Sequence, residues 1–388
     1  MPEWKEKGLK QRLFTPGPTP LPEDVKLSQA REIIHHRTNQ FKQVFQEVEE
    51  GLKYVFQTNN DVFLFTSSGT GAMEATVANL LSPEDEVLVI SGGKFGERWT
   101  EIIKAFGGKV TLLDNEWGKG VDPLLVEKKI SQNPEIKAVF TQLVETSTGV
   151  AYDIETLGNI LEGTPAVLVV DAISGLCAQP LHTDKWRVDA VIGGSQKALM
   201  IPPGLAFVAI SEKAWKLVES STSPKYYWDF RKARNALAKF QTPYTPAVSL
   251  ICALRDSLRL LKKEGLEKVV KRHAELAQAT REAILAMGLK IFGENPSNVV
   301  TSVALPPQID EKKLRKLMQA RFGVQVAGGQ DSLAGKIIRI AHLGWMDASD
   351  IIVVISALEM ALLELGYSVE LGEGLRAAEE VFGEFRGV

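Results

Sequence analysis

Two residues, Asp171 and Lys197, have the types and the setting to do chemistry together. Asp171 ends the apolar run 166–170, a predicted strand, and Lys197 follows the small-residue turn 193–196 (GGSQ). Ligands of open α/β folds bind at the carboxyl edge of the sheet, and glycines let a ligand approach the backbone closely. Either residue alone is weak evidence, because a loop lysine is usually a solvated charge. The pair indicates a functional site.

A third element is the turn 66–71 (TSSGTG), which follows an apolar strand and opens a predicted helix near Ala72. Ser68, Gly69 and Thr70 would offer backbone N–H groups and hydroxyls at a helix N-terminus, where peptide dipoles favour an anion. A capped helix with a flexible entry loop would have the same pattern. The chain has no GxGxxG or GxxxxGK[ST] motif, so a dinucleotide or nucleoside triphosphate is not favoured.

An anion cradle, a strand-end carboxylate and a lysine together match what pyridoxal 5′-phosphate requires of a protein. Its phosphate binds helix-terminal N–H groups, and its aldehyde forms a Schiff base with a lysine amine. Its ring nitrogen pairs with a carboxylate that keeps it protonated, and an aromatic side chain stacked on the ring would complete the site. We therefore expect pyridoxal phosphate as the cofactor.

The elements that must position these residues predict an α/β fold with a mostly parallel sheet. Between residues 60 and 210, short runs rich in Val, Ile, Leu and Phe alternate with segments long enough for crossover helices. The predicted strands are 62–65, 86–90, 109–113, 138–141, 166–170, 190–192 and 205–210.

The later part of the chain predicts a smaller α+β domain. Helical patterns at 247–262 and 265–287 follow a Pro-rich turn at 241–246, and strands then alternate with helices. The predicted elements after residue 287 are strands at 290–292, 299–304, 324–327 and 337–341, a helix at 310–321 and one amphipathic helix from about 347. We expect an N-terminal arm at 1–14, a large cofactor domain at 15–262 and a small domain at 263–388.

Composition excludes several classes of protein. Among 388 residues, 45 Lys and Arg nearly balance 48 Asp and Glu, which leaves no basic footprint for nucleic acid. Cys177 and Cys252 are too few and too far apart for a zinc or iron–sulfur site, so we expect no metal. Residues 1–14 lack the apolar core of a signal peptide, and charges interrupt the apolar stretch 351–365. We expect a cytoplasmic enzyme with no nucleic-acid or membrane partner.

Motifs in order along nearly the whole chain resemble those of the class V aminotransferases. They are TPGPTP at 15–20, HHR at 35–37, SGTGAMEA at 68–75, GKFGERW at 93–99, ETSTG at 145–149, VD at 170–171, SQK at 195–197, PPG at 202–204 and IRI at 338–340. The resemblance is closest to the alanine–glyoxylate and serine–glyoxylate (serine–pyruvate) branch and to related proteins called small subunits of a soluble hydrogenase. It implies the fold type I of pyridoxal phosphate transferases, with the large-domain sheet between helices.

The resemblance also implies roles for residues around the cofactor. Lys197 corresponds to the Schiff-base lysine that also moves the substrate proton, and Asp171 to the partner of the ring nitrogen. Phe95 corresponds to the aromatic residue stacked on the ring, and Thr146 to the hydroxyl that binds the cofactor's phenolic oxygen. The residues that correspond to the phosphate-binding set are Ser68, Gly69, Thr70 and Gln196.

Other residues correspond to positions near the substrate. Arg339 matches the arginine that binds the substrate carboxylate, and the planar guanidinium suits two parallel hydrogen bonds to it. Gly17 matches a loop that lines the substrate pocket. His35 and His36, in the family-like HHR segment, are further candidates for the pocket lining.

A last group bears on assembly. Gln241 and Thr242 correspond to a turn that reaches the phosphate of the neighbouring subunit, with Thr245 as a competing candidate because the prolines shift the alignment. A residue supplied by the neighbour would make the active site complete only in a homodimer. We therefore expect a homodimer with shared active sites.

The expected function is transfer of an amino group from a small amino acid, alanine or serine, to glyoxylate or pyruvate by a ping-pong mechanism. Small neutral donors are favoured because no second arginine motif for a side-chain carboxylate is evident. A pyridoxal phosphate-dependent lyase or cysteine desulfurase is an alternative, although no cysteine follows Cys252. A non-catalytic hydrogenase-associated subunit is an alternative of another class, although two isolated cysteines cannot hold electron-transfer clusters.

Overall fold

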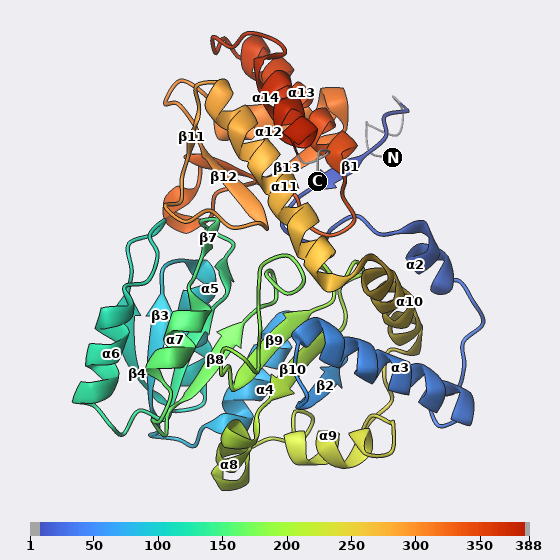
Figure 1. Cartoon of the computed structure of the whole chain (residues 1–388), viewed down its shortest axis with the longest axis vertical. Helices are drawn as coiled ribbons and strands as arrows, with labels where there is room; N and C mark the ends of the chain where they lie inside the picture. The colour runs from blue at the N-terminus through green and yellow to red at the C-terminus, as the bar shows by residue number, and fades with distance from the viewer. Residues whose placement is uncertain (1–7, 385–388) are drawn as a thin grey trace.

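A seven-stranded sheet lies at the centre of the larger, lower lobe in Figure 1. The structure is a computed structural model that describes residues 8–384. The strand order is β2-β10-β9-β8-β5-β3-β4, and neighbours pair in parallel except for β10, which is antiparallel to β2 and β9. The bounds are β2 Asp61–Phe65, β3 Glu86–Ser91, β4 Lys109–Asp114, β5 Ala138–Gln142, β8 Val167–Asp171, β9 Ala190–Gly194 and β10 Ala206–Ile210. The predicted, mostly parallel sheet is confirmed.

Helices pack on this sheet; α4, for example, lies against β9 and β10, and α5 against β3 and β4. α4 begins at Gly69, earlier than the predicted start near Ala72, because the extended backbone of Ser68 serves as the N-cap. The helices of the larger lobe and its N-terminal approach are α2 Glu23–Ser28, α3 Asn39–Phe56, α4 Gly69–Leu80, α5 Lys94–Ala105, α6 Pro123–Gln132, α7 Ile154–Ile160, α8 Glu212–Ser220, α9 Phe230–Leu237 and α10 Val248–Glu264.

A second, five-stranded sheet belongs to the upper lobe and has the order β1-β13-β14-β12-β11. The predicted N-terminal arm contributes its edge strand, because β1 pairs in parallel with β13 and buries Phe14 in the second core. Residues 1–7 of that arm and 385–388 of the predicted small domain lie outside the described residues. The bounds of this lobe's elements are β1 Arg12–Phe14, β11 Lys290–Ile291, β12 Val300–Ala304, β13 Val324–Gly328, β14 Ile337–Ala341, α11 Leu266–Ala286, α12 Glu311–Phe322, α13 Ala348–Glu364 and α14 Glu373–Glu384.

Helix α11 runs diagonally between the two lobes (Figure 1). Leu266 and Val269, in its first turns, belong to the core of the larger lobe, whereas Leu276 and Ala283 belong to the second core. The chain therefore passes from one core to the other along a single helix. The predicted domain boundary after residue 262 lies just before this helix and stays a prediction.

The predicted single amphipathic helix from residue 347 is wrong in one respect, because the segment forms two helices, α13 and α14. Their junction is fixed by buried Glu359, whose carboxylate accepts hydrogen bonds from the N–H groups of Gly372 (3.0 Å) and Gly374 (2.8 Å). The apolar face of α13 packs against α11, α12 and α14. Within residues 8–384, no helix has the length and apolar character needed to cross a membrane.

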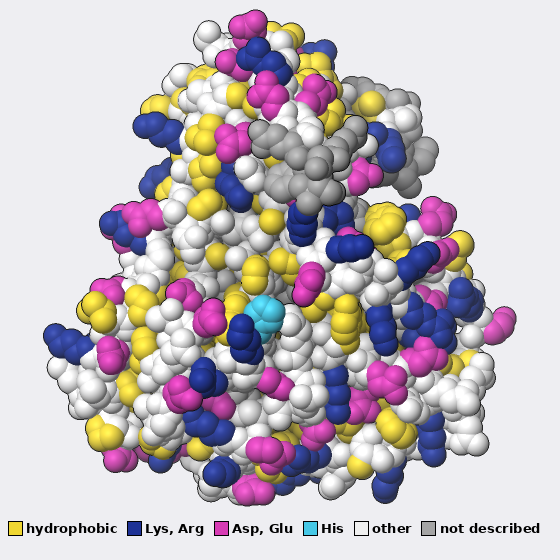
Figure 2. Space-filling view, viewed as in Figure 1, with side chains coloured by type: hydrophobic (Ala, Val, Ile, Leu, Met, Phe, Trp, Pro, Cys, Tyr) yellow, Lys and Arg dark blue, Asp and Glu magenta, His cyan; other side chains and the backbone are white. Residues whose placement is uncertain are grey.

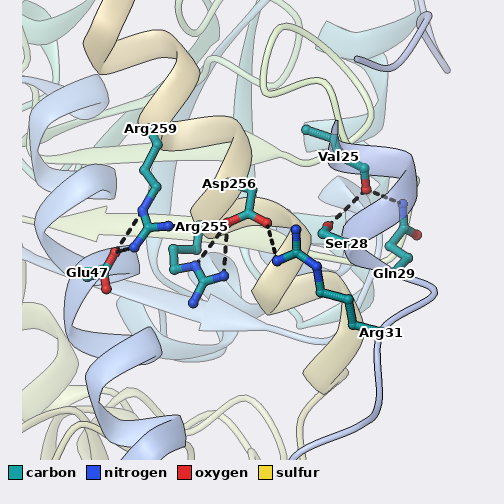
Figure 3. Close-up of polar contacts among 8 residues, drawn as sticks. All are labelled: Val25, Ser28, Gln29, Arg31, Glu47, Arg255, Asp256 and Arg259. Carbon is teal, nitrogen blue, oxygen red and sulfur yellow. Dashed lines mark hydrogen bonds and ion pairs between the residues drawn. The ribbon is translucent and has the colours of Figure 1, made fainter. Parts of the chain in front are cut away.

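Ion pairs attach the N-terminal approach to α10 (Figure 3). Arg31, just after α2, places Nη1 3.3 Å from Oδ2 of Asp256, and Arg259 pairs with Glu47 of α3. These pairs hold the segment that leads from β1 in the upper lobe to α3 in the lower one. Elsewhere on the surface, Figure 2 shows acidic and basic side chains interspersed over the face in view.

Candidate active site

Asp171 and Lys197 meet at the carboxyl edge of the central sheet. Asp171 is the last residue of β8, and Lys197 follows the neighbouring strand β9. Burial raises the pKa of Asp171 to about 6, while a hydrogen bond from the Ile173 N–H (2.8 Å) and the charge of Lys197 oppose the rise. The structure therefore brings the two predicted residues together as an interacting pair.

The Lys197 amine is held in a narrow space. Burial lowers its pKa to about 8, with Asp171 opposing that shift and Arg339 adding to it. Nζ donates a hydrogen bond to the carbonyl oxygen of Pro16, and a Cβ built on Gly17 would lie 2.7 Å from Nζ. Gly17 also has a φ of +131°, which favours glycine. The predicted Gly17 loop thus lies directly against the lysine, whose amine is in part neutral near pH 8.

The turn at the start of α4 lies beside this pair. No side chain caps the first turn of the helix, and a Cβ on Gly69 would collide with Ile173, whose N–H binds Asp171. Ser68 is exposed and Thr70 is half-buried. Gln196 has a buried Oε1 atom without a hydrogen-bond partner in residues 8–384. The N–H groups of the helix terminus are available to an anion, whereas that amide oxygen is an acceptor and only the amide NH2 of Gln196 could donate to one.

Phe95 on the first turn of α5 and Arg98 on the second lie next to that anion cradle. Nη1 of Arg98 donates to Oγ1 of Thr70 (3.3 Å), and its Cζ lies 4.9 Å from the centre of the Phe95 ring. The charge of Arg98 also lowers the pKa of Asp171 and of Lys197. Sequence reasoning missed Arg98, although it stands one helical turn after Phe95 in the GKFGERW motif.

Glu145 is a second residue that sequence reasoning missed, although it begins the ETSTG motif. Its buried carboxylate accepts hydrogen bonds from the N–H groups of Phe95 (3.2 Å), Gly96 (3.0 Å) and Ser147 (3.2 Å). It therefore caps α5, whose own N-cap residue, Gly93, has no side chain to do so. Burial raises the pKa of Glu145. The cap fixes the first turn of α5, which carries Phe95 and leads into the turn that carries Arg98.

Arg339 reaches this region from the other lobe. It lies on β14, and burial lowers its pKa to about 10. Its Nε donates to the carbonyl oxygen of Gly328 and its Nη1 to that of Thr146, both at 2.9 Å. The Thr146 hydroxyl shares a 2.9 Å hydrogen bond with Ser174. Arg339 and Thr146 are thus brought together by direct contact.

The predicted residues of the Pro-rich turn have hydrogen-bond partners other than Lys197 in their own chain. Oε1 of Gln241 accepts from Arg37 (2.8 Å), and the buried Thr242 donates its hydroxyl to the carbonyl oxygen of Tyr244 (2.7 Å). Thr245 is exposed. No hydrogen bond within residues 8–384 joins this turn to Lys197 or Asp171. Their role at a neighbouring subunit stays a prediction.

His35 and His36 belong to the same region as that turn. Their rings lie 4.6 Å apart, and Nδ1 of His35 accepts a hydrogen bond from the Arg37 N–H (3.2 Å). The described contacts place neither histidine beside Lys197. The contacts therefore give no support to the prediction that His35 and His36 line the pocket of their own chain.

Comparisons with known proteins give the family. Residues 23–350 match the family model for class V aminotransferases. The soluble hydrogenase 42 kDa subunit of Anabaena cylindrica is 45% identical over 379 residues, which cover 96% of this chain and 99% of the relative. The serine–glyoxylate aminotransferase of Methylorubrum extorquens is 35% identical over 390 residues, covering 97% and 96%.

A solved structure agrees with these relatives. The ureidoglycine–glyoxylate aminotransferase of Bacillus subtilis has a TM-score of 0.93 and 30% identity, and the match covers 96% of this chain and 98% of that one. The predicted fold type I and the predicted resemblance are confirmed. The chain belongs to the class V aminotransferase family and is an enzyme of that family.

Proposed function

We propose that this enzyme is a pyridoxal phosphate-dependent aminotransferase that moves the amino group of alanine or serine to glyoxylate or pyruvate. The observation that carries the proposal is the pairing, at the ends of neighbouring strands, of a lysine amine of lowered pKa with a buried carboxylate whose charge acts on it, beside an uncapped helix terminus. Two of the similar proteins described above have glyoxylate in their names as a substrate. That shared substrate supports glyoxylate as the acceptor.

The residues present fit pyridoxal phosphate. The uncapped first turn of α4 suits the phosphate, and the amide NH2 group of Gln196 is a further donor for it. Phe95 supplies an aromatic ring beside the turn, and Asp171 a carboxylate for the ring nitrogen. When bound, the cofactor supplies an electron sink that lets the α-hydrogen of an amino acid leave as a proton.

Lys197 would take and return that proton. An amine with a pKa of about 8 is close to the working range of a general base, because both its protonation states are populated near neutral pH. The hydrogen bond from Nζ to Pro16 and the hydroxyl of Thr19, which donates to the Lys197 carbonyl oxygen (3.0 Å), orient the side chain and its backbone. Asp171, with a pKa of about 6, is ionised above that pH and can hold a protonated ring nitrogen.

Arg339 would bind the carboxylate that amino donors and oxo-acid acceptors share. Two of its N–H groups are used by Gly328 and Thr146, which fixes the plane of the guanidinium. Its Nη2 atom makes no hydrogen bond to residues 8–384, so it is free to bind a ligand. One fixed guanidinium for both substrates is what a ping-pong exchange through a single site needs.

We also propose a homodimer in which the turn 241–246 completes the neighbour's phosphate site. The structure favours Thr245 over Thr242 as the contributing residue, because the Thr242 hydroxyl is buried and bound to Tyr244. Tyr226 is 73% exposed and stacks on Tyr244, so an aromatic surface adjoins the turn. Exposed apolar surface of this kind often marks an interface.

The substrate assignment is tested by measuring a panel of amino donors with each of three acceptors: glyoxylate, pyruvate and 2-oxoglutarate. We expect the enzyme, loaded with pyridoxal phosphate, to show the highest kcat/KM with alanine or serine as donor and with glyoxylate or pyruvate as acceptor. Aspartate, glutamate and 2-oxoglutarate are the matched dicarboxylic alternatives. A strong preference for these would contradict the substrate assignment without contradicting the aminotransferase activity.

A further inference from the structure

A second arginine lies in the candidate active site, and the roles considered so far do not use it. Arg98 stands on the second turn of α5 and contacts two of the candidate cofactor residues at once: the hydroxyl of Thr70 and the ring of Phe95. Its other N–H groups make no hydrogen bond to residues 8–384, and none is buried without a partner. A guanidinium has five N–H donors, so most of them are available to a ligand.

The position of Arg98 is fixed from two sides. The Glu145 carboxylate binds the N–H groups of Phe95 and Gly96, and this cap fixes the start of the helix that carries Arg98 on its next turn. The bond to Thr70 places the guanidinium at the first turn of α4, where the helix already favours an anion. A positive side chain and a helix terminus thus converge on one place.

The charges around the site indicate what the guanidinium of Arg98 does at this position. A phosphate ester carries roughly −1.5 to −2 charges at pH 7, and the other candidate phosphate donors, Ser68, Thr70 and Gln196, are neutral. Two arginines influence Lys197, and one of them, Arg339, is bound to Gly328 and Thr146. Of these two arginines, Arg98 is therefore the one with most of its N–H groups left for a phosphate.

We propose that Arg98 binds the phosphate group of the cofactor and balances its charge. Through its contacts it also positions Thr70 for the phosphate and Phe95 for the ring. This inference rests on the proposed use of pyridoxal phosphate. It predicts that the contribution of Arg98 depends on the phosphate group. A purely structural contact with Phe95 would serve the ring whether or not a phosphate is attached.

The test compares the affinity of the apoenzyme for pyridoxal phosphate and for pyridoxal, which lacks the phosphate, by absorbance and tryptophan fluorescence. We expect Arg98→Gln to weaken pyridoxal phosphate binding by about 10- to 100-fold, the loss of one charge-assisted hydrogen bond. The affinity for pyridoxal should change by less than about threefold, since the lost interaction involves the phosphate alone. Arg98→Lys, which keeps the charge, should fall between the wild type and Arg98→Gln. Inorganic phosphate should compete with pyridoxal phosphate less effectively in Arg98→Gln than in the wild type.

Arg234→Gln is the matched control, because Arg234 also lies over an aromatic ring, Trp215 (4.2 Å), and pairs with Glu212 at the surface. It should leave both affinities unchanged. Equal weakening of both ligands by Arg98→Gln, or no weakening of either, would overturn the role at the phosphate. So would an unchanged cofactor affinity with a raised KM for aspartate but not alanine, which would place Arg98 at a substrate side chain. Failure of the wild type to bind pyridoxal phosphate would instead refute the proposed function.

Discussion

At the scale of single residues, burial shifts the pKa values of Asp171 and Lys197 in opposite directions, toward each other. Both groups are driven toward their neutral forms, so the pKa of the carboxyl rises to about 6 and that of the amine falls to about 8. Their mutual attraction opposes both shifts. Between these two values Asp171 is mostly ionised while a growing share of Lys197 is neutral. Capture of an aldehyde needs the neutral amine, and pairing with a protonated ring nitrogen needs the ionised carboxylate.

The rate at which the apoenzyme captures pyridoxal phosphate should therefore rise with pH, with a midpoint near pH 8 rather than near the ordinary lysine value of 10.5. Stopped-flow absorbance between pH 6 and 10 measures this. Asp171→Asn should move the midpoint to lower pH, because the lost negative charge had raised the pKa of Lys197. Lys197→Ala should abolish the phase, and borohydride should then fix no cofactor to the peptide containing residue 197. A midpoint near 10.5 in the wild type would contradict the buried-lysine account.

The site residues that sequence reasoning found are placed by the order of the strands, whereas those that it missed are placed by contacts between distant segments. Asp171 and Lys197 follow predicted strands, so their meeting at one sheet edge could be inferred from order along the chain. Arg98 and Glu145 depend on contacts between α5, α4 and the ETSTG segment, which no local pattern reveals. The same holds for the hydrogen bond of Thr146 to Ser174, which orients its hydroxyl.

At the scale of elements, the cap of α5 shows how one helix start is built from distant parts of the chain. Gly93 is needed at the N-cap because a Cβ there would lie 2.5 Å from Oγ of Ser147. Glu145 then replaces the missing cap side chain. Because its carboxylate is buried, removing it would leave N–H groups of Phe95 and Gly96 without partners.

Glu145→Ala should lower the free energy of unfolding by about 2–4 kcal/mol, since the N–H groups of Phe95, Gly96 and Ser147 lose their acceptor. Glu145→Gln, which keeps one acceptor oxygen, should cost less. The matched control is Asp122→Ala, which removes the exposed cap of α6 and should cost about 1 kcal/mol. Urea unfolding measures all three. Equal losses for Glu145→Ala and Asp122→Ala would show that burial adds nothing to the α5 cap.

Sequence patterns predict elements that have a continuous apolar signal better than elements that depend on a partner elsewhere in the chain. The strands of the central sheet are apolar runs between turns, and all seven were predictable from that signal. β1 is three residues long and is a strand only because β13 offers it a partner, so no local pattern announces it. The break between α13 and α14 depends on the buried Glu359, which looks like a surface charge in sequence.

At the scale of the whole molecule, the candidate site is formed where the two lobes meet. Arg339 on β14 binds the Thr146 carbonyl of the larger lobe, and Lys94 on α5 pairs with Asp331 of the upper lobe at 3.2 Å. Both contacts flank the turn that carries Phe95. Substrate binding through Arg339, as proposed, would therefore depend on the relative position of the lobes, which α11 connects.

A homodimer with shared sites makes a prediction about mixed subunits. Thr245→Ala should weaken pyridoxal phosphate binding by about tenfold through loss of one hydrogen bond to the phosphate, and Lys197→Ala should be inactive. When the two variants are unfolded together and refolded as an equal mixture, random pairing should give about one quarter of the sites a wild-type lysine and a wild-type threonine. Cofactor titration should then show that fraction of tight sites.

Thr242→Ala is the matched control. The Thr242 hydroxyl binds Tyr244 in its own chain, so the variant should keep wild-type cofactor affinity and need no rescue. A monomer in sedimentation, or a tenfold loss for Thr242→Ala but not for Thr245→Ala, would show that this turn does not complete the neighbour's site through Thr245.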